Sequence, residues 1–161
     1  MTNHLHVGRG TTRGALTVFP IWAEVAFPVS YSMDPARARV GELPDGPAVG
    51  SLVVSNTADV PLLLLEGQLL EGGWQNRMVA RSTLLAPGME VPLDVVCVEQ
   101  GRWHGAAGHA ARGRRASTRV RSALGADDSQ GEVWRRVAGY DTSFGPSETS
   151  SYLDHADRAD A

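Results

Sequence analysis

The chain of 161 residues contains no lysine: all fifteen of its Lys and Arg positions are arginine. This absence excludes a Schiff-base lysine, a Walker phosphate lysine and a lysine general base. Cys97 is the single cysteine, which excludes an intramolecular disulfide and a CxxC zinc or iron–sulfur framework. No apolar run approaches the roughly 20 residues that cross a bilayer, and the N-terminus lacks an apolar signal core. We therefore expect a soluble, cytoplasmic protein.

Composition is typical of a globular protein. The 42% hydrophobic and 20% charged residues suit a single domain over residues 1–161 with a buried core. The net charge of −3 is too small for a molecule that coats nucleic acid or an anionic membrane, so we expect neither partner. Arginines do cluster over residues 112–121, but no aromatic residues lie between them. A solvated face that pairs with the acidic C-terminal residues is therefore favoured.

Short apolar runs at regular spacing dominate the middle of the chain. The turn-forming clusters SNTAD, EGG and APG separate them, and no helical pattern long enough for a parallel crossover lies between them. This pattern predicts a mainly β fold: an antiparallel β-sandwich or barrel-like body over about residues 14–103 with a helical C-terminal tail. An α+β fold is the alternative. The expected strands cover residues 14–22, 48–54, 60–67, 75–85 and 89–99, and residues 24–32 are expected to continue extended.

Capping signals predict the helical parts. Asp34 followed by Pro35 predicts one short helical turn. Residues 104–128, rich in Arg, Ala and Gly, are expected to form an exposed loop with a helix near 116–124. Ser129 and Glu132 have the spacing of a capping box at the start of a helix, and residues 147–161 predict a second, polar helix.

Polar residues interrupt the apolar pattern at two places. The segments LLEGGWQNRMV (69–79) and CVEQGRWHG (97–105) each place Glu, Arg and Trp beside an apolar run. Strand alternation puts Asn76 on the same face as Met78, the expected core face, and puts Glu99 at the end of an apolar row. If these strands pair antiparallel through the APG turn, Asn76 and Glu99 lie close together at one end of the body.

The polar and aromatic side chains at this end of the body predict a ligand site. Guanidinium groups suit phosphate, indole suits a flat ring, and carboxylates suit ribose hydroxyls. Catalytic residues are unknown, but Glu71 and Glu99 are candidates for acid–base work if burial separates their pKa values. The expected ligand-binding residues are Glu66, Trp74, Gln75, Asn76, Arg77, Arg102 and Trp103.

Other interpretations of the same residues stay open. Amides and Glu–Arg pairs at strand ends also satisfy neighbouring backbone groups or form salt bridges. Cys97 lies in an apolar row, where a small buried residue is favoured over a nucleophile. Glu99, His104 and His109 are the only metal set that can be composed, as in a cupin-like barrel. Their spacing does not favour a metal site, and no metal or cofactor is expected.

The two motifs, together with LTVFPIW (16–22), VWRRV and TSSYLDHAD, resemble a bacterial domain family of uncharacterised function. The family is named for its association with ADP-ribosylglycohydrolase and rhodanese-phosphatase proteins. The resemblance implies a largely β N-terminal portion and a connection with ADP-ribose or NAD-derived metabolites, but it transfers no catalytic residues. The matching positions are Glu66, Gly67, Gly72, Gln75, Asn76, Arg77, Cys97, Glu99, Arg102 and Trp103.

The chain resembles the front part of the family domain, as a truncated version would. That resemblance implies that a homo-oligomer or another partner completes the fold. Two hypotheses follow for function. The first is a module that binds a small molecule, an ADP-ribose-like or other nucleotide-derived ligand, with hydrolysis through Glu71 and Glu99 as an extension. The alternative is a non-enzymatic module that binds a protein partner and uses its two motifs to lock turns and strand ends.

Overall fold

The computed structural model describes residues 5–23 and 30–159. The chain divides into two compact units, Met1–Ser30 and Tyr31–Ala161. Most of the extended segment expected over residues 24–32 lies outside the described residues. Within the described ranges, no helix is both long and apolar enough to span a membrane.

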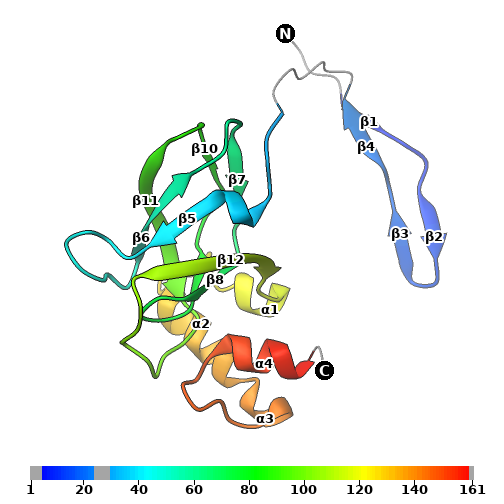
Figure 1. Ribbon diagram of the computed structural model, residues 1–161. Helices are drawn as coiled ribbons and strands as arrows, with labels where there is room; N and C mark the ends of the chain where they lie inside the picture. The colour runs from blue at the N-terminus through cyan, green and yellow to red at the C-terminus, as the bar shows by residue number, and fades with distance from the viewer. Residues whose placement is uncertain (1–4, 24–29, 160–161) are drawn as a thin grey trace. The chain divides into compact units, whose positions relative to one another are not determined.

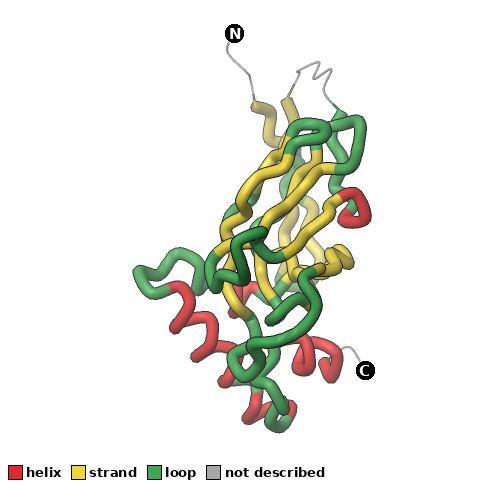
Figure 2. Tube along the Cα trace, turned by 60° about the vertical axis from the view of Figure 1, so that its left-hand side comes forward, coloured by secondary structure: helices red, strands yellow, loops and turns green. Residues whose placement is uncertain are grey.

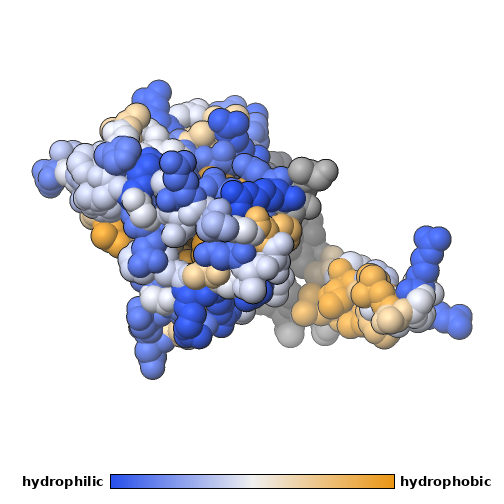
Figure 3. Space-filling view, turned by 90° about the horizontal axis from the view of Figure 1, so that it is seen from below, coloured by the Kyte–Doolittle hydropathy of each residue, from blue (hydrophilic) through white to orange (hydrophobic). Residues whose placement is uncertain are grey.

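The first unit is a β-hairpin of paired short strands (Figure 1). Pro20 separates β3 from β4, so the strand expected over residues 14–22 is two strands. Leu5, Leu16 and Ile21 in the described part of this unit are exposed, and Figure 3 shows an apolar cluster on its surface. The antiparallel pairs are β1 (Leu5–Val7) with β4 (Ile21–Ala23), and β2 (Thr11–Arg13) with β3 (Leu16–Val18).

The second unit is built on a closed antiparallel barrel (Figures 1 and 2). The order of strands around the barrel is β11-β6-β5-β12-β8-β9. The mainly β class and the barrel-like body are therefore confirmed. The barrel strands are β5 (Ala38–Gly41), β6 (Ser51–Asn56), β8 (Gln68–Gly72), β9 (Arg77–Val79), β11 (Glu90–Cys97) and β12 (Gly108–Arg115).

The barrel interior is apolar over most of its length. Leu52, Leu70 and Val79 are fully buried there, and they pack with Val95. A separate antiparallel pair, β7 (Leu62–Leu64) with β10 (Thr83–Leu85), adds Leu62, Leu64 and Leu85 to the same core. The run expected as one strand over residues 75–85 is thus divided between β9 and β10, which belong to different sheets.

Residues 104–128 do not form the expected loop. They contain β12, which closes the barrel by pairing with both β5 and β8. The sequence of β12, GHAARGRR, has one buried residue, His109, so it carries no hydrophobic row by which a strand could be predicted. Backbone pairing to two neighbours holds it in place instead. The helix expected near residues 116–124 is confirmed as α1 (Thr118–Arg121).

The helices form a second layer outside the barrel (Figure 2). Apolar side chains of α1, α2 and α4 pack with Leu69, Met78 and Val96 from β8, β9 and β11. The two helices predicted near the C-terminus are confirmed, although Asp128 rather than Ser129 caps α2: its Oδ1 accepts a hydrogen bond from the Gly131 N–H at 3.0 Å. These helices are α2 (Ser129–Ala138), α3 (Asp141–Phe144) and α4 (Tyr152–Ala159).

A single helical turn, η1 (Pro35–Arg37), precedes the barrel. Asp34 caps it, since its Oδ1 accepts a hydrogen bond from the Ala36 N–H at 3.0 Å. The turn predicted from Asp34 and Pro35 is confirmed.

Both faces of β9 are buried, and this changes the expected orientation of its side chains. Val79 packs inside the barrel, whereas Met78 packs against the helices. Arg77 shares the inward face with Val79 because strand side chains alternate. The sequence pattern shows which side chains share a face, but it cannot identify the barrel interior when helices cover the outside. Arg77, expected on the face opposite the core, therefore points into the barrel.

Candidate functional site

Residues from both polar motifs meet at one end of the barrel. The Asn76 backbone N–H donates to Oε2 of Glu99 at 2.9 Å, and the Val98 N–H donates to the Asn76 carbonyl at 3.0 Å. The expected proximity of Asn76 and Glu99 is confirmed. We call this end of the barrel the polar end; its residues are Glu42, Trp74, Gln75, Asn76, Arg77, Cys97, Glu99, Arg102, Trp103 and His109.

Glu99 and Arg102 form a buried, two-point ion pair at the polar end. Arg102 Nε donates to Oε1 of Glu99 at 3.0 Å, and Nη2 donates to Oε2 at 2.7 Å. Burial by itself would raise the pKa of Glu99. The hydrogen bonds from Arg102 and from the Asn76 backbone outweigh that effect and hold the pKa below its usual range. Glu99 is therefore ionised at neutral pH.

Arg102 and Asn76 both hold the chain together through hydrogen bonds. Arg102 also donates to the carbonyls of Gly72, Gly73 and His104, at 3.3, 2.7 and 2.9 Å, which uses all five of its N–H groups. Asn76 Oδ1 accepts from the Gly72 N–H at 2.8 Å, and Nδ2 donates to Ser151 Oγ at 3.2 Å. These contacts agree with the hypothesis that the two motifs serve to lock turns and strand ends.

Arg77 differs from Arg102 although both belong to the polar end. Its side chain is completely buried. Nη1 donates to Oε1 of Gln75 at 2.9 Å, but Nε and Nη2 have no hydrogen-bond partner among the described residues. In Arg102 the same two nitrogens bind the two oxygens of Glu99. Apart from an interaction with the Cys97 thiol, this edge of Arg77 has no acceptor, and it keeps the bidentate arrangement that recognises a carboxylate or a phosphate.

Trp103 covers Arg77, and Trp74 packs against Trp103. The Trp103 ring centroid lies 5.5 Å from Cζ of Arg77, a cation–π contact. Trp74 meets Trp103 edge-on, with 5.6 Å between ring centroids. Trp103 is 42% exposed while Arg77 is 0% exposed, so the indole separates the guanidinium from solvent.

Glu42 and His109 complete the polar end and were not expected there as a pair. Glu42 Oε1 accepts from the Trp74 N–H at 3.0 Å and lies 3.1 Å from His109 Nε2. Burial lowers the pKa of His109, partly offset by Glu42, so the imidazole is neutral at pH 7 and Nε2–H donates to the carboxylate. Both side chains are nearly inaccessible, at 5% exposure for Glu42 and 0% for His109.

Cys97 lies opposite Arg77 in the barrel ladder and is buried, as expected for a small core residue. Burial raises the pKa of the thiol to about 11, although Arg77 opposes the shift. The protonated thiol donates to Oε1 of Gln75 at 3.0 Å. Cys97 therefore acts as a hydrogen-bond donor that, with Arg77, fixes Gln75, and a nucleophilic role is not favoured.

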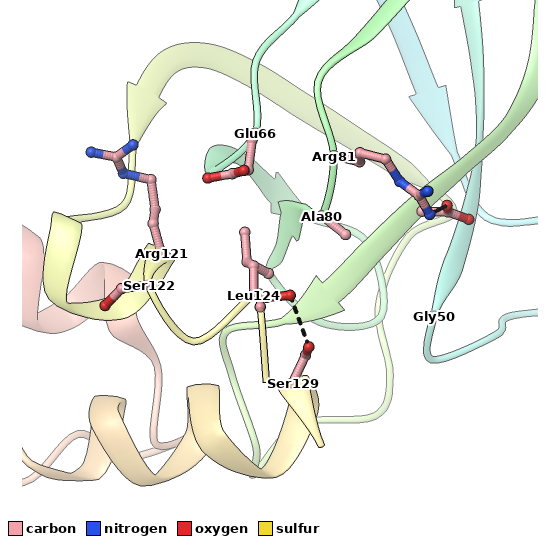
Figure 4. Close-up of a pocket in the computed structure, with 10 residues that line it drawn as sticks. Gly50, Glu66, Ala80, Arg81, Arg121, Ser122, Leu124 and Ser129 are labelled. Atoms are coloured by element: carbon pink, nitrogen blue, oxygen red, sulfur yellow. Dashed lines mark hydrogen bonds and ion pairs between the residues drawn. The ribbon is translucent and has the colours of Figure 1, made fainter. Parts of the chain in front are cut away.

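Two of the expected site residues lie elsewhere. Glu71 is on the outward face of β8, where Oε2 lies 3.3 Å from Arg112 Nε. Glu66 lies in the turn before β8, on the wall of a separate cavity of about 650 Å³; Figure 4 shows it between Arg121 and Arg81. The structure does not bring either carboxylate to the other expected site residues.

The metal set composed from the sequence is not assembled. Glu99 binds Arg102, and His109 binds Glu42. Over residues 5–23 and 30–159, no group of three or more His, Cys, Asp or Glu side chains is arranged to hold a metal ion.

The fold and the polar end define a small antiparallel barrel with buried charged groups at one end and a helical layer on one side. The chain belongs to the family of ARG and Rhodanese-Phosphatase-superfamily-associated Protein domains, whose model matches residues 4–161. The resemblance inferred from the two motifs is thereby confirmed. No curated protein and no solved structure matches the chain significantly.

Proposed function

We propose that the chain binds a small anionic ligand derived from a nucleotide, such as ADP-ribose or another NAD-derived compound, at the polar end of the barrel. The observation that carries this proposal is the unoccupied edge of Arg77, formed by Nε and Nη2. A buried guanidinium without a counter-ion lowers the free energy of unfolding by several kcal/mol. Each unsatisfied buried donor accounts for about 1–3 kcal/mol of that loss. A phosphate that binds this edge would satisfy both donors at once.

The aromatic residues support a ligand that also carries a flat ring. Trp103 lies directly over the buried guanidinium, and Trp74 packs edge-on against Trp103. An indole that turns aside would open the way to Arg77 and could then stack on an adenine or nicotinamide ring. The family association with ADP-ribosylglycohydrolase proteins agrees with this ligand class.

The contacts within the polar end assign different roles to the expected residues. Arg77 would bind the phosphate, held in position by Gln75, and Trp103 would contact the ring. Asn76, Glu99 and Arg102 would support the site, because their hydrogen bonds are made within the chain. Hydrolysis through Glu71 and Glu99 stays a prediction that this arrangement does not favour, since each carboxylate is bound to a different arginine.

Thermal denaturation with added ligand tests the proposal. ADP-ribose at about 100 times its dissociation constant should stabilise the wild-type chain by roughly 2.7 kcal/mol. Arg77→Gln should abolish this stabilisation. Arg81→Gln is the matched control, because Arg81 is 79% exposed and remote from the polar end. Equal stabilisation of both variants by ADP-ribose would remove Arg77 from the site, and no stabilisation of the wild-type chain by any nucleotide would reject the proposal.

A protein-interaction module is the second candidate, and the first unit favours it. Leu5, Leu16 and Ile21 are 73%, 66% and 66% exposed in the hairpin. An isolated two-stranded hairpin is marginally stable in water, so a second surface that covers these side chains would stabilise it. Light scattering on the purified chain tests this candidate. A mass above the 17.2 kDa of one chain that returns to one chain in Leu16→Ser/Ile21→Ser would support self-association.

A further inference from the structure

Glu42 presents a second unoccupied group at the polar end. Its Oε2 is buried and has no hydrogen-bond partner in the described part of the chain. Glu42 binds the Trp74 backbone N–H, Trp74 packs on Trp103, and the Trp103 ring lies over Arg77, so the two charged side chains belong to the same end of the barrel. This end therefore contains two unused donors, from Arg77, and one unused acceptor, from Glu42.

The orientation of Glu42 is fixed by its neighbours. Oε1 interacts with the Trp74 N–H and with His109 Nε2, at 3.0 and 3.1 Å. These two contacts hold the carboxylate from one side and leave Oε2 as a preorganised acceptor. Gly73 makes this packing feasible, because a Cβ at position 73 would lie 2.0 Å from His109 Nε2.

We propose that Glu42 is a specificity-determining residue that accepts a hydrogen bond from a hydroxyl group of the ligand, so that the site selects phosphorylated sugars over simple phosphates. This inference rests on the proposed function, because Arg77 must bind the phosphate. A carboxylate close to a bound phosphate repels it unless a donor lies between them. A sugar hydroxyl supplies that donor, whereas a phosphate ester without hydroxyls leaves the repulsion uncompensated.

Ligands that differ only in their hydroxyl groups test the inference on the unmodified protein. The probes are ribose 5-phosphate and methyl phosphate, titrated calorimetrically at pH 8, where both are dianions. The wild-type chain should bind ribose 5-phosphate at least about tenfold more tightly than methyl phosphate, the difference expected for a hydrogen bond to a charged group. Equal affinities would overturn the role of Glu42 without affecting the proposed phosphate site.

The Glu42→Gln variant assigns the preference to Glu42. Its amide keeps the size of the side chain but removes the charge, so the variant should bind methyl phosphate at least as tightly as the wild-type chain and lose the preference for ribose 5-phosphate. A preference that persists in Glu42→Gln would overturn the inference. If the variant does not fold, the comparison of the two probes on the wild-type chain decides alone.

A third outcome would reject the whole proposed site and not only the role of Glu42. If ADP-ribose, ribose 5-phosphate and methyl phosphate all leave the wild-type chain unbound, the proposed function and this inference fail together. Arg77 and Glu42 would then be a structural pair linked by buried water. In that case the double variant Arg77→Met/Glu42→Gln should be more stable than either single variant, as for a buried ion pair replaced as a unit.

Discussion

Glu99 and Arg102 bind each other through two parallel hydrogen bonds, of 3.0 and 2.7 Å, at 3% and 19% side-chain exposure. The pair links the end of β11 to the segment before β9, because Glu99 also accepts from the Asn76 N–H. Arg102 extends the link to the carbonyls of Gly72 and Gly73. One ion pair thus ties the residues that follow β11 to the connection between β8 and β9, beyond the last residue pairs of the barrel ladder.

Breaking this pair should destabilise the chain strongly. Glu99→Gln leaves the nearly buried Arg102 guanidinium without its counter-ion, and we expect the free energy of unfolding to fall by about 3 kcal/mol. Urea denaturation followed by circular dichroism measures the change. The control is Asp94→Asn, which breaks the exposed pair with Arg81 at 2.8 Å and should cost less than about 1 kcal/mol. Similar losses in both variants would contradict the structural role of Glu99.

The stability of the chain should also depend on pH through His109. Its pKa lies below the ordinary value of 6.5 because the imidazole is buried, so the unfolded chain binds a proton more readily than the folded chain. The stabilisation is complete above pH 6.5 and is lost as the pH falls toward the pKa of the folded state, by at most about 1.4 kcal/mol per pH unit. Urea midpoints measured from pH 8 to pH 5 test this. His109→Asn should give a flatter curve over that range, and an unchanged slope would assign the pH dependence to other groups.

The sequence predicted the β class, the later helices and the meeting of the two polar motifs. These succeeded because they depend on local patterns: apolar runs between turns, capping residues, and antiparallel neighbours whose far ends meet. The contact of Asn76 with Glu99 is the clearest case. The division of residues 75–85 between two sheets was not predictable, since Ala80, Arg81 and Ser82 contain no Gly or Pro to mark a break.

The sequence did not predict Glu42 and His109 as a pair at the polar end, and the physical reason is different. His109 belongs to β12, whose sequence contains almost no apolar residues and whose position is set by backbone pairing. Glu42 follows β5, a strand of four residues with one fully buried side chain, Val40. Neither segment has the hydrophobic periodicity that indicates a strand, so alternation could not place either side chain inside a barrel. Long-range pairing, rather than local sequence, brings Glu42 to His109.

Cys97 should be unreactive in the folded chain. Its thiol is buried, its pKa is raised to about 11, and its proton is donated to Gln75. Only a thiolate reacts rapidly with an aromatic disulfide reagent, so we expect no modification of the native chain at pH 8 and one thiol per chain in guanidinium chloride. Rapid stoichiometric modification without denaturant would show that the polar end opens readily. The rate with ADP-ribose present then becomes informative, because a ligand at Arg77 should slow any such opening.

Gly73 should tolerate no side chain, because two separate requirements meet at this residue. Its φ of +56° is one that residues with a Cβ rarely adopt, and a Cβ would lie 2.0 Å from His109 Nε2. Gly73→Ala should therefore displace His109 from Glu42 and lower the free energy of unfolding by about 1–3 kcal/mol. Gly108→Ala is the matched control, since no heavy atom lies within 4 Å of its Cβ position. The measurement is the urea midpoint of each variant, followed by calorimetric titration with ribose 5-phosphate. If Gly73→Ala is as stable as Gly108→Ala and binds the probe with wild-type affinity, close packing of Gly73 on His109 does not shape the site.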